Sequence, residues 1–97
     1  MKRLDIKADA QRDLAEIADY SYQEFGPHVG AEYLRGLRAN FALILEFSEI
    51  GSVFEGVKPI VRLKTYRSHR IFYRVTKRDI AIVRVLHKAR DARALLD

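Results

Sequence analysis

The stretch that decides the fold is HRIFYRV at positions 69–75, followed by DIAIVRVLH at 79–87. Both runs are rich in β-branched and aromatic residues, which are typical of strands. A third candidate strand covers 60–66. Connections of two residues (67–68) and three residues (76–78) separate these segments, and such short connections are typical of hairpins. The C-terminal half therefore predicts three consecutive antiparallel strands.

The N-terminal half shows helical periodicity. Residues 2–7 alternate, with Leu4 and Ile6 on one side, and predict a short strand. Two amphipathic helices follow, and Asp9 is the expected N-cap of the first. The apolar residues at helical spacing are Leu14, Ile17, Ala18, Ser21 and Phe25 in the first helix, and Tyr33, Leu34, Leu37, Phe41, Ile44 and Leu45 in the second.

A glycine-proline step separates the two helices. Gly26 ends the first helix and Pro27 suits the first turn of the next, so an antiparallel helical hairpin is expected. Residues 49–59 predict a loop, and the tail 90–97 predicts one or two helical turns. Helices followed by strands indicate a single α+β domain over residues 1–97. Its N-terminal strand and helical hairpin pack on an antiparallel sheet.

Strand alternation divides the sheet residues into two faces. If both hairpins pair odd with odd positions, the odd set forms the core and the even set is more accessible. The odd set is Val61, Leu63, Thr65, His69, Ile71, Tyr73, Val75, Ala81, Val83, Val85 and His87. The even set mixes basic and apolar side chains: Arg62, Lys64, Arg70, Phe72, Arg74, Ile80, Ile82, Arg84 and Leu86.

The mixed face suits either an acidic amphipathic helix or a nucleic acid with bases to stack. A solvated sheet face is the alternative, since antiparallel sheets commonly have one. Arg84 fits that alternative poorly because it interrupts a strand that is apolar on both faces. An unpaired charge there would be expensive, so Arg84 must reach a partner. Glu46, Glu49 or a backbone carbonyl are the candidates.

Charge is unevenly distributed over the 97 residues. The formal net charge is +5, with −3 on residues 1–49 and +8 on residues 50–97. A basic half predicts an acidic partner, either nucleic acid or an acidic protein segment, although an arginine-rich soluble domain remains the simpler alternative. The absence of cysteine excludes disulfides, cysteine-type zinc sites and thiol catalysis. Three isolated histidines make a metal site improbable, and no cofactor is expected.

Targeting and catalytic motifs are missing from the sequence. No apolar run reaches the ~20 residues of a membrane span, and no long apolar segment follows the basic N-terminus, so a cytoplasmic protein is expected. Glycine-rich phosphate loops, HExxH and GxSxG do not occur. His87 and His69 are more typical of packed structural histidines than of a general base. Cations abound, but a convincing acid/base pair does not.

Several motifs resemble the ParE toxins of the RelE/ParE superfamily, from bacterial type II toxin–antitoxin modules. The match extends from about Leu4 to Leu96, and its most specific parts are positions 69–75 and 82–87. The other matching positions are Ala10-x-x-Asp13-Leu14-x-x-Ile17-x-x-Tyr20, Ala31, Tyr33, Leu37, Phe41, Gly51 and Arg62. The resemblance implies a RelE/ParE-like fold and a cognate antitoxin, typically a ribbon–helix–helix (ParD-like) protein. It also implies DNA gyrase as the target.

The same resemblance leaves an enzymatic alternative, because RelE-like relatives cleave mRNA on the ribosome. Such nucleases use a basic cluster and a C-terminal aromatic or histidine pair. Here Tyr73 is the last tyrosine, a departure that favours the ParE branch. On the nuclease interpretation, the phosphate-binding and proton-transfer candidates are Arg62, Arg70, Arg84, His87 and Arg90.

On the favoured interpretation the protein binds its target and has no catalytic residue. An inert binding module that has lost toxicity is a third hypothesis. The tail from Arg90 onward is expected to be exposed and free to touch a target. The expected partner-binding residues are Arg62, Arg70, Phe72, Arg74, Arg84 and Arg90.

Overall fold

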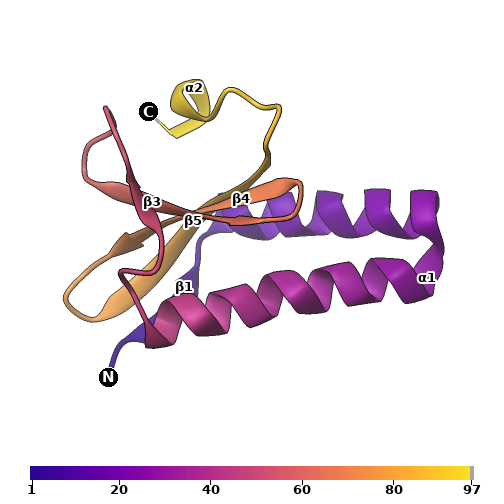
Figure 1. Ribbon diagram of the computed structural model, residues 1–97, viewed down its shortest axis with the longest axis horizontal. Coiled ribbons are helices and arrows are strands. Elements are labelled where there is room, and N and C mark those ends of the chain that lie inside the picture. Colours follow the sequence, from indigo (N-terminus) through magenta and orange to yellow (C-terminus); the bar gives the residue numbers. More distant parts are fainter. Residues whose placement is uncertain (97) are drawn as a thin grey trace.

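The computed structural model describes residues 1–96, which form one α+β unit (Figure 1). The predicted fold class is confirmed. None of the helices in this part of the chain is long and apolar enough to cross a membrane. The elements in chain order are β1 (Arg3–Ile6), α1 (Ala8–Glu46), β2 (Ser52–Phe54), β3 (Val61–Tyr66), β4 (His69–Val75), β5 (Asp79–His87) and α2 (Ala92–Leu96).

The predicted helical hairpin is α1, whose two arms lie antiparallel on either side of a sharp break (Figure 1). Gly26 makes the break, with a φ of 85° and a ψ of 166° that are nearly exclusive to glycine. Pro27 begins the second arm. The predicted N-cap was wrong: Lys7 holds that position and Asp9 lies in the first turn. The Lys7 N–H donates to the Ile82 carbonyl of the sheet at 3.0 Å and the Lys7 carbonyl accepts the Gln11 N–H, so the helix begins directly after the last sheet hydrogen bond.

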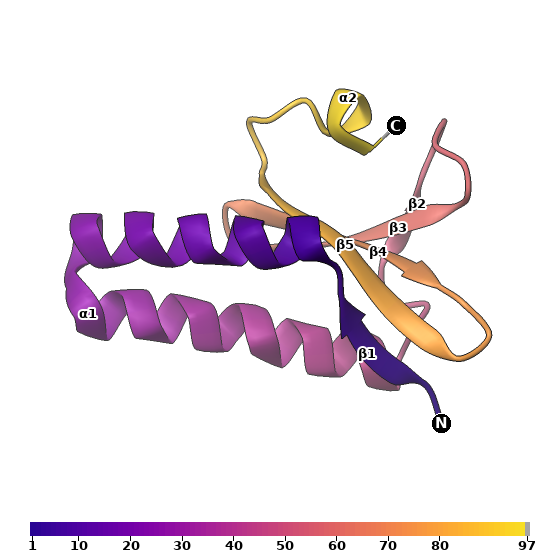
Figure 2. The same cartoon turned by 180° about the vertical axis from the view of Figure 1, so that it is seen from behind.

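The sheet has five strands in the order β1-β5-β4-β3-β2. The pairs β3–β4 and β4–β5 are antiparallel, as predicted. However, β1 lies parallel to β5, so the sheet is mixed (Figure 2). Strand β2 lies within the segment predicted as a loop. The parallel pair needs a long crossover connection, and α1 begins that connection directly after β1.

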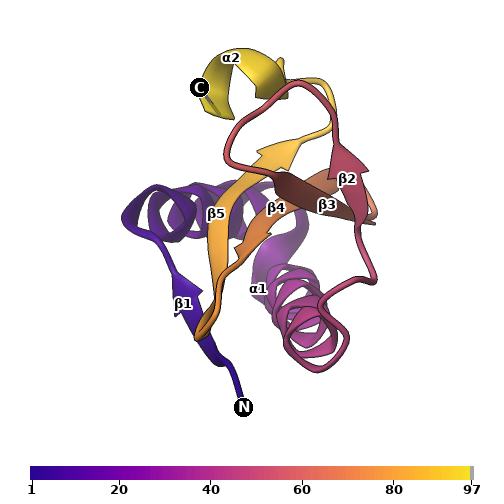
Figure 3. The ribbon, with the colours of Figure 1, turned by 90° about the vertical axis from the view of Figure 1, so that its left-hand side faces the viewer.

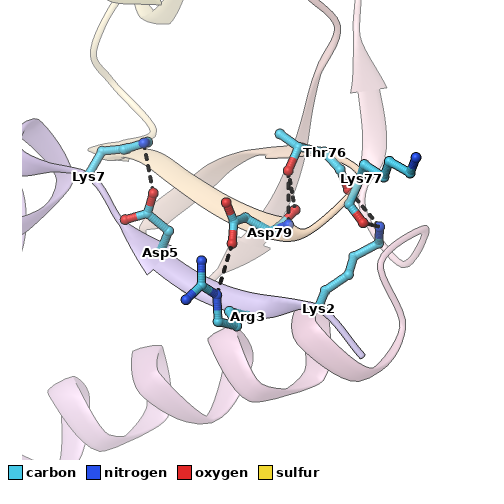
Figure 4. A network of polar contacts seen from close by, with 7 residues as sticks. All are labelled: Lys2, Arg3, Asp5, Lys7, Thr76, Lys77 and Asp79. Atoms are coloured by element: carbon cyan, nitrogen blue, oxygen red, sulfur yellow. Dashed lines mark hydrogen bonds and ion pairs between the residues drawn. The ribbon is translucent and has the colours of Figure 1, made fainter.

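Polar contacts hold β1 beside the β4–β5 hairpin (Figure 4). The Lys2 ammonium donates to the carbonyls of Thr76 and Lys77, at 2.6 and 3.0 Å. Arg3 is paired in register with Asp79, and their side chains approach to 3.6 Å. These groups are largely exposed, so their contacts fix the position of β1 more than they increase the stability of the protein.

The expected odd-with-odd pairing fails in β3. Arg62 pairs with Tyr73 and Lys64 pairs with Ile71, so even residues of β3 share a face with odd residues of β4. A bulge then changes the parity within β5, because Val83 has no partner in β4. On the N-terminal side of Val83, the even residues Ile80 and Ile82 of β5 therefore face the helices.

The main core lies between α1 and the sheet. Because of the bulge, Ile80 and Ile82 are fully buried there, although they were expected on the more accessible face. Tyr73 and Ile71 are buried as predicted. The side chains from α1 in this core are Ala10, Leu14, Ile17, Leu37, Phe41 and Ile44.

A second, smaller core occupies the opposite face, beneath α2 (Figure 3). It contains Phe72 and Leu86, again even positions that were expected to be accessible, together with Val57, Val61 and Ala92. The C-terminal tail supplies the cover, so the prediction of a free tail was wrong. Burying apolar surface on both faces left no large solvated side to the sheet.

Candidate functional site: a groove under the helical hairpin

A groove of about 620 Å³ opens where the α1 hairpin extends past one end of the sheet. The α1 arms supply one wall, and the β3–β4 turn, the end of β5 and the segment after it supply the other. The residues around it are Asp13, Glu16, Ile17, Tyr20, Ser21, Phe25, Val29, Tyr33, Arg67, Ser68, His69, Val85, Leu86, His87 and Arg90.

The helical wall of the groove is aromatic and exposed. Tyr20 and Phe25 are 62% and 60% exposed, and their rings meet edge to face with centroids 6.4 Å apart. Val29 continues the wall on the second arm and is also exposed. Large apolar groups gathered around a concavity are typical of a surface that binds a partner.

A Tyr33–His69–His87 cluster joins the second arm of α1 to the sheet side of the groove. The Tyr33 hydroxyl and His69 Nδ1 lie 2.6 Å apart, and the two imidazole centroids lie 5.4 Å apart. The histidines are direct partners across β4 and β5. Burial lowers the pKa of His69, and the neighbouring His87 lowers it further. His87 Nδ1 accepts the Ala89 N–H at 3.0 Å, so its Nε2 remains for a ligand.

Asp13 joins the first arm of α1 to β5. Its two carboxylate oxygens accept hydrogen bonds from the Arg84 guanidinium at 2.8 and 2.9 Å. One of them also accepts the Val85 N–H at 2.9 Å. The adjacent carboxylate raises the pKa of Arg84. Arg84 does have a buried partner, as expected, but neither Glu46 nor Glu49 provides it.

Asp13 belongs to the matching family positions but was not predicted as the partner of Arg84, although its place on the helix carried a signal. Asp13 lies three residues after Ala10 and four before Ile17, on the stripe that is buried against the sheet. A carboxylate on such a stripe requires a cation or several N–H donors.

The predicted partner-binding residues do not form one face. Phe72 is fully buried between Phe54 and the second core, and Arg84 is occupied by Asp13, so neither is available to a partner. Arg62 donates to the Gly51 carbonyl at 2.7 Å on the helical side of the sheet. The prediction grouped these residues because they occupy even positions. The observed register of β3 against β4 and the bulge in β5 place them on different faces of the sheet.

Arg70, Arg74 and Arg90 remain partly or fully exposed. Arg70 donates to the Arg90 carbonyl at 3.0 Å, and Arg74 to the Pro59 carbonyl at 3.3 Å. Arg90 lines the groove. Of the five nuclease candidates, only His87 and Arg90 line it, whereas Arg62, Arg70 and Arg84 do not. Within residues 1–96, no three histidine or carboxylate side chains are grouped so as to hold a metal ion.

Known proteins resemble this chain in sequence, and a solved structure resembles it in fold. Residues 4–92 match the family described as the ParE toxin of the type II toxin–antitoxin system parDE. Toxin ParE1 of Caulobacter vibrioides is 38% identical over 96 residues, which cover 99% of each chain. Toxin ParE1 of Mycobacterium tuberculosis is 36% identical over 83 residues, covering 84% of this chain and 85% of the relative.

A solved structure of the chromosomal ParDE toxin–antitoxin system from P. aeruginosa has the same fold. Its TM-score is 0.78 at 21% identity, and the match covers 90% of this chain and 96% of that one. The sequence match over nearly the whole length, together with the shared strand–hairpin–sheet architecture, leads to one assignment. The chain belongs to the ParE toxin family of type II toxin–antitoxin systems.

Proposed function

We propose that this toxin inhibits DNA gyrase and that direct binding of a cognate ribbon–helix–helix, ParD-like antitoxin neutralises it. Membership of the ParE family supports the gyrase target. The observation that supports a protein partner is the aromatic groove around Tyr20 and Phe25. Its exposed apolar wall suits the apolar face of an amphipathic helix, which is a common mode of peptide recognition.

Inhibition by binding fits the geometry better than phosphodiester cleavage does. His69 and His87 already touch edge to face at 5.4 Å, so a phosphate could lie between them only if the rings separated. Arg84 is held by Asp13, and Arg62 by the Gly51 carbonyl. An enzyme of this kind requires an acid and a base on either side of the reacting group. Surface recognition needs no such arrangement.

The target is tested by supplying the purified toxin to two reactions. We expect it to block supercoiling by DNA gyrase and to leave mRNA intact on translating ribosomes. Cells that express it should show DNA breakage and SOS induction rather than cut transcripts. Ribosome-dependent mRNA cleavage without gyrase inhibition would replace this proposal with the nuclease alternative. Normal growth on expression of the folded protein would indicate an inert module.

The antitoxin interface is tested with a groove variant. Tyr20→Ser combined with Phe25→Ser removes the exposed aromatic wall without touching a fully buried core residue. We expect antitoxin affinity to fall at least about tenfold, which corresponds to ~1.4 kcal/mol. Leu43→Ser combined with Phe47→Ser, which removes two exposed apolar side chains outside the groove lining, is the matched control. Equal affinities for the groove variant and the control would place the antitoxin elsewhere.

We also propose that Arg70 and Arg74 contribute to the antitoxin interface through acidic residues of the partner. Both arise from the same face of β4 and keep part of their surface exposed. Charge-assisted contacts of this kind increase specificity and the rate of association. Reversing both to Glu should weaken binding about tenfold or more. Unchanged affinity of the folded double variant would remove both arginines from the interface.

A further inference from the structure

The two walls of the groove differ in charge. On the sheet side, Arg67 and Arg90 both line the groove, and neither forms an ion pair within residues 1–96. On the helical side the charged residues are Asp13 and Glu16, and Arg84 neutralises Asp13. Arginines without an ion pair in residues 1–96 therefore lie on one rim, opposite the aromatic wall, and the Arg67 guanidinium is positioned there over the Tyr66 ring, 5.6 Å from its centroid.

The His69–His87 pair lies on the same rim as the two arginines. The titratable and charged groups near the pair come from every neighbouring element. They are Tyr33, Glu16 and Asp13 from α1, Tyr66 from β3, Arg67 from the β3–β4 turn and Arg90 from the segment after β5, and Asp13 is itself paired with Arg84 of β5. Among the described residues 1–96, Glu16 is the single carboxylate of the lining that has no arginine partner. The rim thus offers several donors and few acceptors.

We propose that this rim is a carboxylate-binding subsite. Arg67, Arg90 and the His69–His87 pair would receive a Glu or Asp side chain from an acidic amphipathic segment whose apolar face packs on Tyr20 and Phe25. The inference rests on the proposed antitoxin binding and specifies its chemistry. The helical wall would bind the apolar face of the partner, and the sheet rim would bind its carboxylate.

Charge and polarity favour a peptide over a nucleic acid in this groove. The wall of Tyr20, Phe25 and Val29 is apolar, and Glu16 would repel a phosphate backbone at the opposite rim. Nucleic-acid surfaces instead carry extended positive charge along the backbone path. A side-chain carboxylate requires only a few donors on one side of the groove, and Arg67, Arg90 and the two histidines line that side.

Binding of a carboxylate at this rim should be linked to proton uptake. Burial lowers the pKa of His69 and so favours its neutral form in the free protein, whereas a nearby carboxylate favours the imidazolium form. On protonation, Nδ1 would donate to the Tyr33 hydroxyl, so the 2.6 Å contact can persist. Because the bound state takes up a proton, affinity should increase as the pH falls through the titration range of histidine.

The test uses two synthetic helical peptides with identical leucine faces, one carrying Glu and the other Gln on the polar face. Binding to the full-length toxin is followed by amide chemical shifts in ¹⁵N-labelled protein at pH 6 and pH 8. We expect the Glu peptide to bind at least about fivefold more tightly than the Gln peptide at pH 6, and the difference to shrink at pH 8. Equal affinities at both pH values, or no binding of either peptide, would overturn the proposal.

Paired variants locate the effect on the rim. Arg67→Gln with Arg90→Gln should abolish the preference for Glu and leave the affinity for the Gln peptide unchanged. Lys77→Gln with Arg78→Gln removes the same charge from the exposed turn between β4 and β5 and should retain the preference. If both double variants lose it equally, the preference reflects net charge and the subsite is absent.

Failure of the subsite and failure of the proposed function give different results. A missing Glu preference in a toxin that still blocks gyrase and is still neutralised by its antitoxin would refute the subsite alone. A toxin without gyrase inhibition would refute the proposed target, and the peptide comparison would still report on the rim.

Discussion

Asp13 and Arg84 are separated by 71 residues in sequence, yet the carboxylate accepts two guanidinium hydrogen bonds at 2.8 and 2.9 Å. The third bond of the carboxylate, from the Val85 N–H, lies just past Ile82, where the pairing of β1 with β5 ends. After the pairing with β1 ends, the Asp13 side chain of α1 therefore accepts the next hydrogen bond from the backbone of β5. The contact fixes the first arm of the hairpin over the sheet and so positions the groove.

Replacing Asp13 with Ala should destabilise the protein strongly. Removing one member of a buried pair leaves an uncompensated charge, which typically costs ~3–5 kcal/mol. Because Arg84 keeps some solvent contact, we expect about 3 kcal/mol, measured as a lower free energy of unfolding in urea. Asp9→Ala removes an exposed carboxylate paired with Arg12 and should cost less than ~1 kcal/mol. Similar losses for the two variants would show that the Asp13 contact is not structural.

A side chain at position 51 should be poorly tolerated. A Cβ on Gly51 would lie 2.6 Å from the Leu63 carbonyl oxygen and 2.7 Å from the Tyr73 hydroxyl. That hydroxyl accepts the Gly51 N–H and donates to the Ser48 carbonyl, so it cannot retreat without losing both bonds. Gly51→Ala should therefore lower the free energy of unfolding by roughly 2 kcal/mol or more, measured by thermal denaturation. An unchanged melting temperature would contradict this.

Phe72→Ala tests the second core. Phe72 is fully buried, so truncation should cost about 3–5 kcal/mol in chemical unfolding. Val75 occupies the end of the same strand and is exposed, so Val75→Ala should cost less than ~1 kcal/mol. If Phe72→Ala had an equally small effect, the tail would not cover this face in solution.

Leu37→Ala tests the packing of the second helical arm on the sheet. Leu37 is completely buried in the main core, and its truncation should destabilise the protein by about 2–5 kcal/mol. Leu43→Ala, at an exposed position of the same arm, serves as the control and should be nearly neutral. Calorimetry on both variants measures the difference, and a loss below ~1 kcal/mol at Leu37 would contradict the observed packing.

His69 should make stability depend on pH. Its pKa is lowered in the folded protein, so the unfolded chain binds more protons in the window below the usual value of 6.5. Stability should therefore fall as the pH drops below about 6.5 and should level off again below the folded pKa. His69→Asn retains an acceptor near the Tyr33 hydroxyl and removes the titration. Urea unfolding between pH 8 and pH 5 should show a smaller pH dependence in the variant, and identical slopes would contradict the assignment.

Much of the architecture follows from local patterns. Two stripes at helical spacing and the Gly26-Pro27 step predicted the hairpin, and β-branched runs with short connections predicted β4 and β5 with their observed bounds. These features depend on neighbours a few residues apart, which is why periodicity and turn chemistry reveal them. Family membership could likewise be inferred from motifs spread along the chain.

The site could be recognised only in the tertiary structure. It depends on the strand register, on the burial of one sheet face by the tail, and on contacts between residues distant in the sequence. A single unpaired residue, Val83, reversed which side chains of β5 face the helices, and the docked tail buried Phe72. Polar groups far apart in sequence met only through packing, as Asp13 did with Arg84 and Tyr33 with His69. Sequence by itself determined the helical arms and the strands β1, β3, β4 and β5, since that preference is local, whereas β2 lies in the segment predicted as a loop. Which arginines and histidines remain available to a partner was decided by the tertiary fold, since burial and ion pairing depend on contacts between segments distant in the chain.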